Sequence, residues 1–273
     1  MLTRDFFIAM LKSWPKEGQV MIDKLLIAQT FRQLAMMIDA GLPLVDALKI
    51  CSDNNNNKTL ADALNDIRAA IQKGTPFGEA SALHPSLFTE YQIALIKAGE
   101  MGGILDTVLN RLATYAEKDM DFENQLEKSL VKKFKSNLAW LKDQLRANVD
   151  NIVFDRLILE MPHIGKLLML VEMTRYCRML GTLVACGVSI LDALDITSNL
   201  TENTALKAEL YEISVAVSEG KSIGVTMKKS KLIPPLFGQM IRVGESTGGL
   251  DVMLAKLADY SEQEIEILMR ESF

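Results

Sequence analysis

Residues 40–50 read Ala-Gly-Leu-Pro-Leu-Val-Asp-Ala-Leu-Lys-Ile, and residues 186–196 read Cys-Gly-Val-Ser-Ile-Leu-Asp-Ala-Leu-Asp-Ile. Gly41 and Gly187 are equivalent in these stretches and lie 146 residues apart (187 − 41 = 146). The same spacing relates Gly74 to Gly220. One unit of about 110 residues is therefore present twice, which predicts two tandem domains of one fold.

Apolar residues recur with helical spacing in both copies. Thr59 to Lys73 carries them at i, i+3, i+4, i+7 and i+11, which is typical of an amphipathic helix. Gly41 is expected to end a helix in the left-handed conformation, and Pro43 to begin the next one. In the first copy we further expect a helix from Pro85 to Ala98, a turn over 99–103 and a long helix from Ile104. In the second copy the expected helices are Thr174–Ala185, Ser189–Thr197, Thr204–Glu219, Ser222–Lys229, Pro235–Val243 and a helix from Leu250.

The predicted fold class is all-α, because no stretch alternates with a two-residue period. Two homologous antiparallel bundles of about six short helices each are expected, since short loops favour antiparallel neighbours. The expected boundaries are an N-terminal extension (1–19), the first bundle (20–130), a connector (131–153) and the second bundle (154–273). The segment 122–156 reads as a charged amphipathic helix that joins the bundles.

Composition limits the function. A net charge of −5 and a pI near 5.3 argue against nucleic acid as the main partner. Three cysteines without metal or disulfide spacing are expected to be reduced and buried. The longest uncharged apolar run, 179–191, is shorter than the roughly 20 residues of a membrane-spanning helix.

Residues suited to catalysis are scarce. His84 and His163 lack partners at metal-ligand spacing, so neither a metal nor a cofactor is expected. Gly220-Lys221-Ser222 resembles the end of a phosphate-binding loop, but Val215 stands where that loop needs its first glycine. We interpret it as the start of a helix, and we expect the protein not to be an enzyme.

The most distinctive local motif is a glycine-rich turn with two acids, found in both copies. Its members are Gly99, Glu100, Gly103 and Asp106 in the first copy, and Gly244, Glu245, Gly248 and Asp251 in the second. Catalysis by the two carboxylates is one interpretation. We favour packing and capping of the next helix, because glycine permits tight turns and acids stabilise helix N-termini. A partner surface at these eight residues stays open.

Other repeated positions are expected to be structural. They include Arg32 and Arg178, which lie in otherwise apolar helices and are each expected to pair with an acid that the sequence does not identify. The remaining members of this set are Gly41, Pro43, Gly74, Gly187 and Gly220.

Together these motifs resemble the repeat of the type II secretion F family. The resemblance covers roughly 20–130 and 153–270. It rests in the first copy on 31–34, 40–44, 73–74, Phe77, 99–100 and 103–106, in the second on Arg175, Arg178, Leu180, Leu183, Gly187, 220–222, Pro235, 244–245 and Gly248, and between them on 155–157 and 159–167.

That resemblance implies cytoplasmic helical bundles of an inner-membrane platform protein. Such proteins serve type IV pilus assembly or type II secretion, and have transmembrane helices between and after the repeats. Here the corresponding segment, 134–149, is charged and the chain ends at Phe273, so we expect either an engineered soluble form or an unusual soluble relative. The native parent would lie in the bacterial inner membrane with these domains on the cytoplasmic side, and this chain alone would be soluble and cytoplasmic.

The expected function is a non-enzymatic scaffold that couples an assembly ATPase to movement of pilin or pseudopilin subunits. Expected partners are that ATPase, other inner-membrane assembly proteins, the pilins and further copies of the chain, with no nucleic acid and with membrane contact only through segments absent here. The alternatives are a soluble helical adaptor unrelated to secretion and, less favoured, a ligand-binding or enzymatic helical protein that uses Glu100, Glu245 or a bundle cavity.

Overall fold

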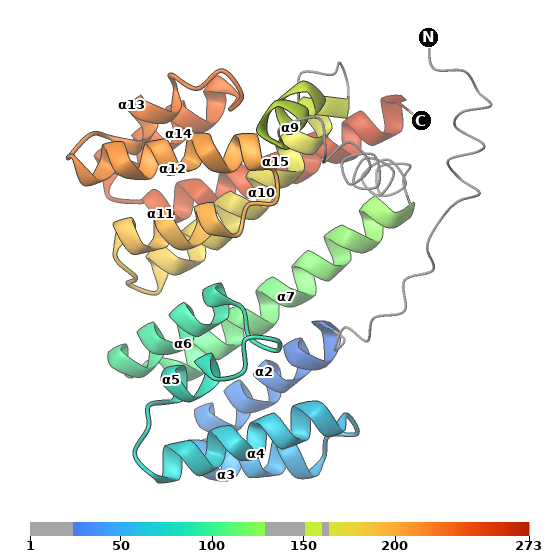
Figure 1. Ribbon diagram of the computed structural model, residues 1–273, viewed down its shortest axis with the longest axis vertical. Coiled ribbons are helices and arrows are strands. Elements are labelled where there is room, and N and C mark those ends of the chain that lie inside the picture. The colour runs from blue at the N-terminus through green and yellow to red at the C-terminus, as the bar shows by residue number, and fades with distance from the viewer. Residues whose placement is uncertain (1–23, 129–150, 160–163, 273) are drawn as a thin grey trace.

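The computed structural model describes residues 24–128, 151–159 and 164–272, and every regular element in these ranges is an α-helix (Figure 1). The all-α prediction is confirmed. The expected N-terminal extension (1–19), most of the expected connector (131–150 of 131–153) and His163 lie outside the described residues.

Six helices form the first repeat, and six form the second in the same order. The first repeat contains α2 (Lys24–Asp39), α3 (Leu44–Asp53), α4 (Lys58–Gln72), α5 (Phe77–Ala82), α6 (Glu90–Gly102) and α7 (Leu105–Lys128). The second contains α10 (Ile164–Ala185), α11 (Ile190–Asn199), α12 (Thr204–Ser218), α13 (Ile223–Met227), α14 (Pro235–Thr247) and α15 (Leu250–Ser272). A further helix, α9 (Asn151–Leu159), precedes the second repeat and packs on α10 and α12.

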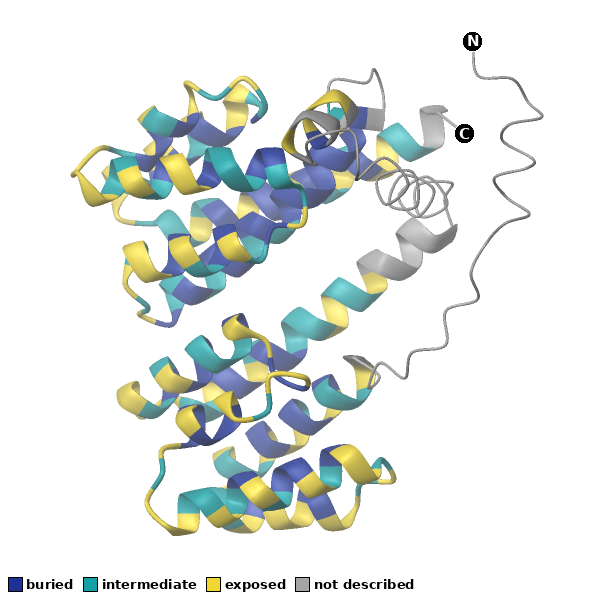
Figure 2. Ribbon diagram, in the orientation of Figure 1, coloured by how far each residue is buried: buried dark blue, intermediate teal, exposed yellow. Residues whose placement is uncertain are grey.

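In each repeat the first and last helices form a long antiparallel pair, α2 with α7 and α10 with α15 (Figure 1). The shorter helices pack beside this pair and enclose an apolar core, drawn dark blue in Figure 2. Its largest buried side chains include Phe31 and Phe77 in the first repeat and Tyr176 and Phe237 in the second. Burial of these side chains is the main stabilising contribution of each bundle.

Glycines end the helices at matching places in the two repeats. Gly41 and Gly187 have φ of 84° and 82°, the left-handed region in which side chains other than hydrogen are strained. The amide of Leu42 donates to the Met37 carbonyl, and that of Val188 donates to the Leu183 carbonyl. The predicted glycine caps at these two positions are confirmed.

Some expected helix bounds were wrong. Residues 85–87 form turns, and α6 starts at Glu90, where Thr89 and Gln92 form a capping box. Pro43 is the residue before α3, not its first helical residue. The helix expected from Thr174 starts ten residues earlier, at Ile164 (174 − 164 = 10).

The expected turn at 99–103 was also placed too early. Residues 99–102 are the last turn of α6, and residues 244–247 are the last turn of α14. Only Gly103 and Gly248 adopt the left-handed conformation there. Gly99 and Gly244 serve close packing instead, because a Cβ at either position would lie 2.9 Å from an atom of the following helix, in Val108 and in Leu250 respectively.

Candidate functional site

The glutamate of the glycine–glutamate motif points back to the short helix that precedes it. In the first repeat, the backbone N–H of Phe77 donates to Glu100 Oε1 at 2.7 Å, and that of Gly78 donates to Oε2 at 3.2 Å. Phe77 and Gly78 are the first two residues of α5, whose N–H groups have no partner within the helix. Glu100 therefore caps α5 from the last turn of α6.

Glu245 makes the same contact in the second repeat. Its carboxylate accepts from the backbone N–H of Ile223 at 2.7 Å and of Gly224 at 3.0 Å, at the start of α13. The hydroxyl of Ser222 adds a third hydrogen bond, 2.5 Å to Oε2. We expected these acids near the N-terminus of the helix that follows. In the structure both carboxylates instead cap the preceding short helix, α5 or α13. Each glutamate is more than 20 residues away in sequence from the amides that it binds, so local sequence does not reveal the contact.

Close backbone packing brings each glutamate to its helix. A Cβ on Gly224 would lie 2.5 Å from the amide nitrogen of Arg242 and 2.5 Å from the carbonyl oxygen of Gly238. The equivalent Gly78 would meet Lys97, with the backbone nitrogen at 3.1 Å. These glycines let α5 rest on α6 and α13 on α14, so that the carboxylates reach the free amides.

The two aspartates of the motif lie apart from the glutamate caps. Asp106 and Asp251 occupy the first turns of α7 and α15, where a negative charge favours the helix dipole. Both are half-buried. For these two acids the expected place near the start of the next helix is confirmed, and the motif does not assemble a carboxylate pair on one turn.

The exposed part of the α6–α7 corner is apolar. Met101 is 90% exposed, and Ile104 beside it is also exposed. Gly103 and Gly248 are exposed at the two corners, whereas Gly99 and Gly244 are buried. Met101 was not among the residues expected at a partner surface, although a large apolar residue inside a glycine-rich corner is an available signal of exposure.

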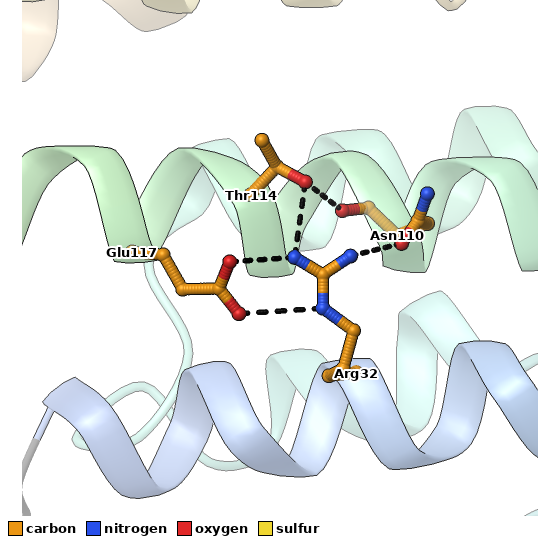
Figure 3. A network of polar contacts seen from close by, with 4 residues as sticks. All are labelled: Arg32, Asn110, Thr114 and Glu117. Carbon is orange, nitrogen blue, oxygen red and sulfur yellow. Dashed lines mark hydrogen bonds and ion pairs between the residues drawn. The ribbon is translucent and has the colours of Figure 1, made fainter.

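The repeated arginines pair with repeated glutamates. Arg32 on α2 forms a two-pronged ion pair with Glu117 on α7, at 2.6 Å and 3.3 Å, and also donates to Asn110 and Thr114 (Figure 3). Arg178 on α10 pairs with Glu262 on α15. Each pair fastens the first helix of its repeat to the last one.

A further capping contact joins α9 to the second repeat. The buried carboxylate of Asp155 accepts hydrogen bonds from the backbone N–H of Thr204, at 2.8 Å, and from its hydroxyl, at 2.6 Å. Thr204 is the first residue of α12, so Asp155 satisfies an amide at the start of that helix. Arg156 also reaches Glu209 on α12, at 3.5 Å.

A cleft of about 480 Å³ lies where the repeats meet. It is lined by α7, α10 and α15, with the cationic side chains of Arg111, Lys118, Arg178 and Lys256 and the carboxylates of Asp251 and Asp259. Charges of both signs face this space.

The thiols are unsuited to chemistry at neutral pH. All three cysteines are free and buried. Burial raises the pKa of Cys51 to about 11 and raises the pKa of Cys177 still further. It also raises the pKa of Cys186, against the opposing influence of Arg111. The reactive thiolate is therefore suppressed at all three.

Neither a metal site nor a membrane span is found among the described residues. In these ranges no group of three or more His, Cys, Asp or Glu side chains is placed to hold a metal ion. None of the helices in these ranges combines the length and the apolar character that crossing a membrane requires.

Comparison with known proteins identifies relatives along most of the chain. The family model of type II secretion system protein F matches residues 30–133 and 176–272, one match to each repeat. The type IV pilus assembly protein PilC of Myxococcus xanthus is 30% identical over 86% of this chain and 70% of its own length. The type II secretion system protein F of Xanthomonas campestris is 28% identical over 89% of this chain and 74% of its own length. The PilC protein of Pseudomonas aeruginosa is 26% identical, covering 88% and 80% respectively. This chain belongs to the type II secretion system protein F family.

Proposed function

We propose that this chain is a non-enzymatic platform for type IV pilus assembly or type II secretion. In this role it couples an assembly ATPase to the movement of pilin or pseudopilin subunits, and it also contacts other assembly proteins and further copies of itself. The relatives named for pilus assembly and for type II secretion support the setting. We place the native protein in the bacterial inner membrane, with both repeats on the cytoplasmic side.

The scaffold role is supported by one observation: the repeated polar residues form structural contacts within each bundle. Glu100 and Glu245 cap short helices, and Arg32 and Arg178 fasten the long helix pairs. A side chain engaged in such hydrogen bonds is held against its own bundle, whereas a catalytic acid needs access to substrate. The repeated unit is therefore best suited to present rigid helical surfaces.

We further propose that the exposed corners contact the ATPase. The candidates are the eight residues of the two glycine–glutamate motifs, of which Gly99 and Gly244 are buried and could act only by holding the corner in shape. The accessible centre is Gly103 with Met101 and Ile104 in the first repeat and Gly248 in the second. Exposed apolar side chains beside polar ones are common at the centre of protein interfaces.

A pull-down tests this proposal. The immobilised chain is expected to capture the assembly ATPase of its own organism, and Met101→Asp is expected to weaken capture about tenfold, as loss of a buried apolar anchor does. Tyr211→Asp is the matched control, because Tyr211 is an exposed large side chain on α12, away from both corners. Failure of the unmodified chain to capture the ATPase would overturn the coupling role, and equal capture by both variants would remove the corner as its site.

A further inference from the structure

The contact between the repeats uses different faces of the two copies. Helices α6 and α7 of the first repeat touch α10 and α11 of the second. Asp119 on α7 pairs with Arg175 on α10 at 3.3 Å, and Arg111 on α7 donates to the Cys186 sulfur at 3.6 Å. Helices α10 and α11 are the counterparts of α2 and α3, so this contact is head-to-tail and not symmetric.

In a head-to-tail contact each unit uses only one of its two contact faces, so one face of each repeat stays unused. In the second repeat the unused face lies on α14 and α15, which correspond to α6 and α7; we call it the α14–α15 face. In the first repeat the unused face lies on α2, which corresponds to α10; we call it the α2 face. Helix by helix, residues of α6 and α14 correspond at a spacing of 145 (235 − 90 = 145), and residues of α2 and α10 at 146 (185 − 39 = 146).

The α14–α15 face is apolar and open. Tyr91 on α6 is 2% exposed and lies near Thr182 and Cys186 of the second repeat, whereas its counterpart Leu236 on α14 is 36% exposed. Val243 lies two helical turns further along the same side of α14 and is exposed too. Tyr260 on α15, the counterpart of half-buried Tyr115, completes an exposed apolar face.

The α2 face carries matching apolar residues. Thr182 on α10 faces the phenol of Tyr91, and its counterpart on α2 is Met36, which is 65% exposed. Leu25, the counterpart of fully buried Val171, is exposed on the same helix. The internal pair Tyr91 and Thr182 is polar, and the corresponding unused pair Leu236 and Met36 is apolar. Both positions change from a polar side chain in the internal contact to an apolar one on the unused faces, so Leu236 and Met36 are complementary to each other.

We propose that copies of this chain associate head to tail, with the α14–α15 face of one copy on the α2 face of the next. The contact repeats the one inside the chain, so two copies present four units in series. A head-to-tail contact closes into a ring or extends, according to the rotation that each step adds. This deepens the proposed self-association by naming its surfaces, and its test uses the purified chain alone, so its failure is separate from a failed ATPase pull-down.

Size-exclusion chromatography with light scattering on the full chain measures the association. The unmodified chain is expected to form oligomers larger than a dimer or a closed ring. Met36→Asp and Leu236→Asp should each raise the dissociation constant about tenfold or more, because each places a charge at the centre of an apolar contact. Tyr211→Asp, with a similarly exposed side chain on α12, should leave the association unchanged.

Mixing the two variants gives the decisive result. The Met36→Asp chain keeps an intact α14–α15 face and the Leu236→Asp chain keeps an intact α2 face, so the mixture should form a 1:1 heterodimer that grows no further. Met36→Cys and Leu236→Cys chains should likewise give a disulfide-linked band only when mixed. Thermal unfolding followed by circular dichroism checks that each variant is folded, as expected for exposed side chains.

Three results would overturn the proposal. The first is an unmodified chain that stays monomeric up to about 0.1 mM. The second is an oligomer that neither aspartate substitution weakens. The third is a mixture of the two folded variants that forms no heterodimer, which would indicate a symmetric contact through one face.

Discussion

Arg178 and Glu262 join the first and last helices of the second repeat, at the positions that Arg32 and Glu117 occupy in the first. The two arginines are 146 residues apart and the two glutamates 145 (178 − 32 = 146; 262 − 117 = 145). The surroundings differ, however. The Arg178 side chain is 12% exposed where that of Arg32 is 31%, because Arg178 lies in the cleft between the repeats.

Double-mutant cycles should find unequal coupling in these two pairs. With Met replacing arginine and Gln replacing glutamate, we expect about 0.5 kcal/mol for Arg32 with Glu117, as for other exposed pairs. The less exposed pair Arg178 and Glu262 should give about 1–2 kcal/mol, since water screens it less. Urea denaturation of each single and double variant measures both values. Equal coupling energies would show that the cleft does not shield the second pair.

Substitution of the capping glutamates should lower stability. Glu100→Ala leaves two backbone N–H groups of α5 without their acceptor, which should reduce the free energy of unfolding by about 1–3 kcal/mol. Glu245→Ala should cost at least as much, because a third donor, the Ser222 hydroxyl, also loses its partner. Thermal denaturation measures the loss, with exposed Glu212→Ala on α12 as control.

These glutamates also separate capping from direct partner contact. Unchanged stability of Glu100→Ala together with lost ATPase capture would favour a partner-contacting carboxylate. Lowered stability with normal capture at a temperature where the variant is folded would leave only the cap.

The repeat and the helices were predictable from sequence because their signals are local. Gly41 and Gly187 mark helix ends through backbone geometry that glycine alone tolerates well, and the apolar spacing of α4 requires no knowledge of its neighbours. Duplication reinforced both signals, since the same feature appeared twice at one spacing.

The candidate site was less predictable because its contacts are long-range. Glu100 reaches Phe77 across 23 residues, and Arg32 reaches Glu117 across 85. An arginine in an apolar helix indicates that an acid is needed, but packing of α2 on α7 decides which one. Gly99 was misread for a related reason: glycine permits either a turn or a close helix contact, and only the neighbouring helix shows that the second applies.

Glycine-to-alanine substitutions should fall into two groups. At Gly41 and Gly187 a Cβ meets nothing within 4 Å, so only the positive φ opposes it, and each change should cost about 1 kcal/mol. At Gly224 the Cβ meets two backbone atoms at 2.5 Å, which forces α13 away from α14. We expect Gly224→Ala to cost about 3 kcal/mol or more and to weaken the Glu245 cap.

Gly78→Ala provides the comparison for Gly224→Ala. Its closest contact, at 2.3 Å, is the Cγ of the flexible Lys97 side chain, and the backbone nitrogen is at 3.1 Å. Part of the clash can be relieved by rotation of that side chain, so the loss of stability should be smaller than at Gly224. Thermal denaturation of the four alanine variants tests the order, which would be contradicted if Gly41→Ala were the most damaging.

The three thiols should resist modification in the folded chain. Burial raises the pKa of Cys51 to about 11, so at pH 8 only about one thiol in a thousand is ionised, and access is limited as well. Native chain should therefore react with Ellman's reagent over hours, and all three thiols should react at once in guanidinium chloride.

The same shift fixes how stability depends on pH. Because the folded pKa of Cys51 is raised above its unfolded value, near 9, the protonated thiol favours the native state. This contribution is complete below about pH 9 and is lost as pH rises toward 11. The midpoint of urea denaturation should accordingly fall between pH 9 and 11. Cys51→Ser, whose hydroxyl does not ionise in this range, should show a smaller fall than the unmodified chain. An equal fall in the two proteins would assign the alkaline effect to other groups, among them the buried phenols of Tyr91 and Tyr176, whose pKa values burial also raises.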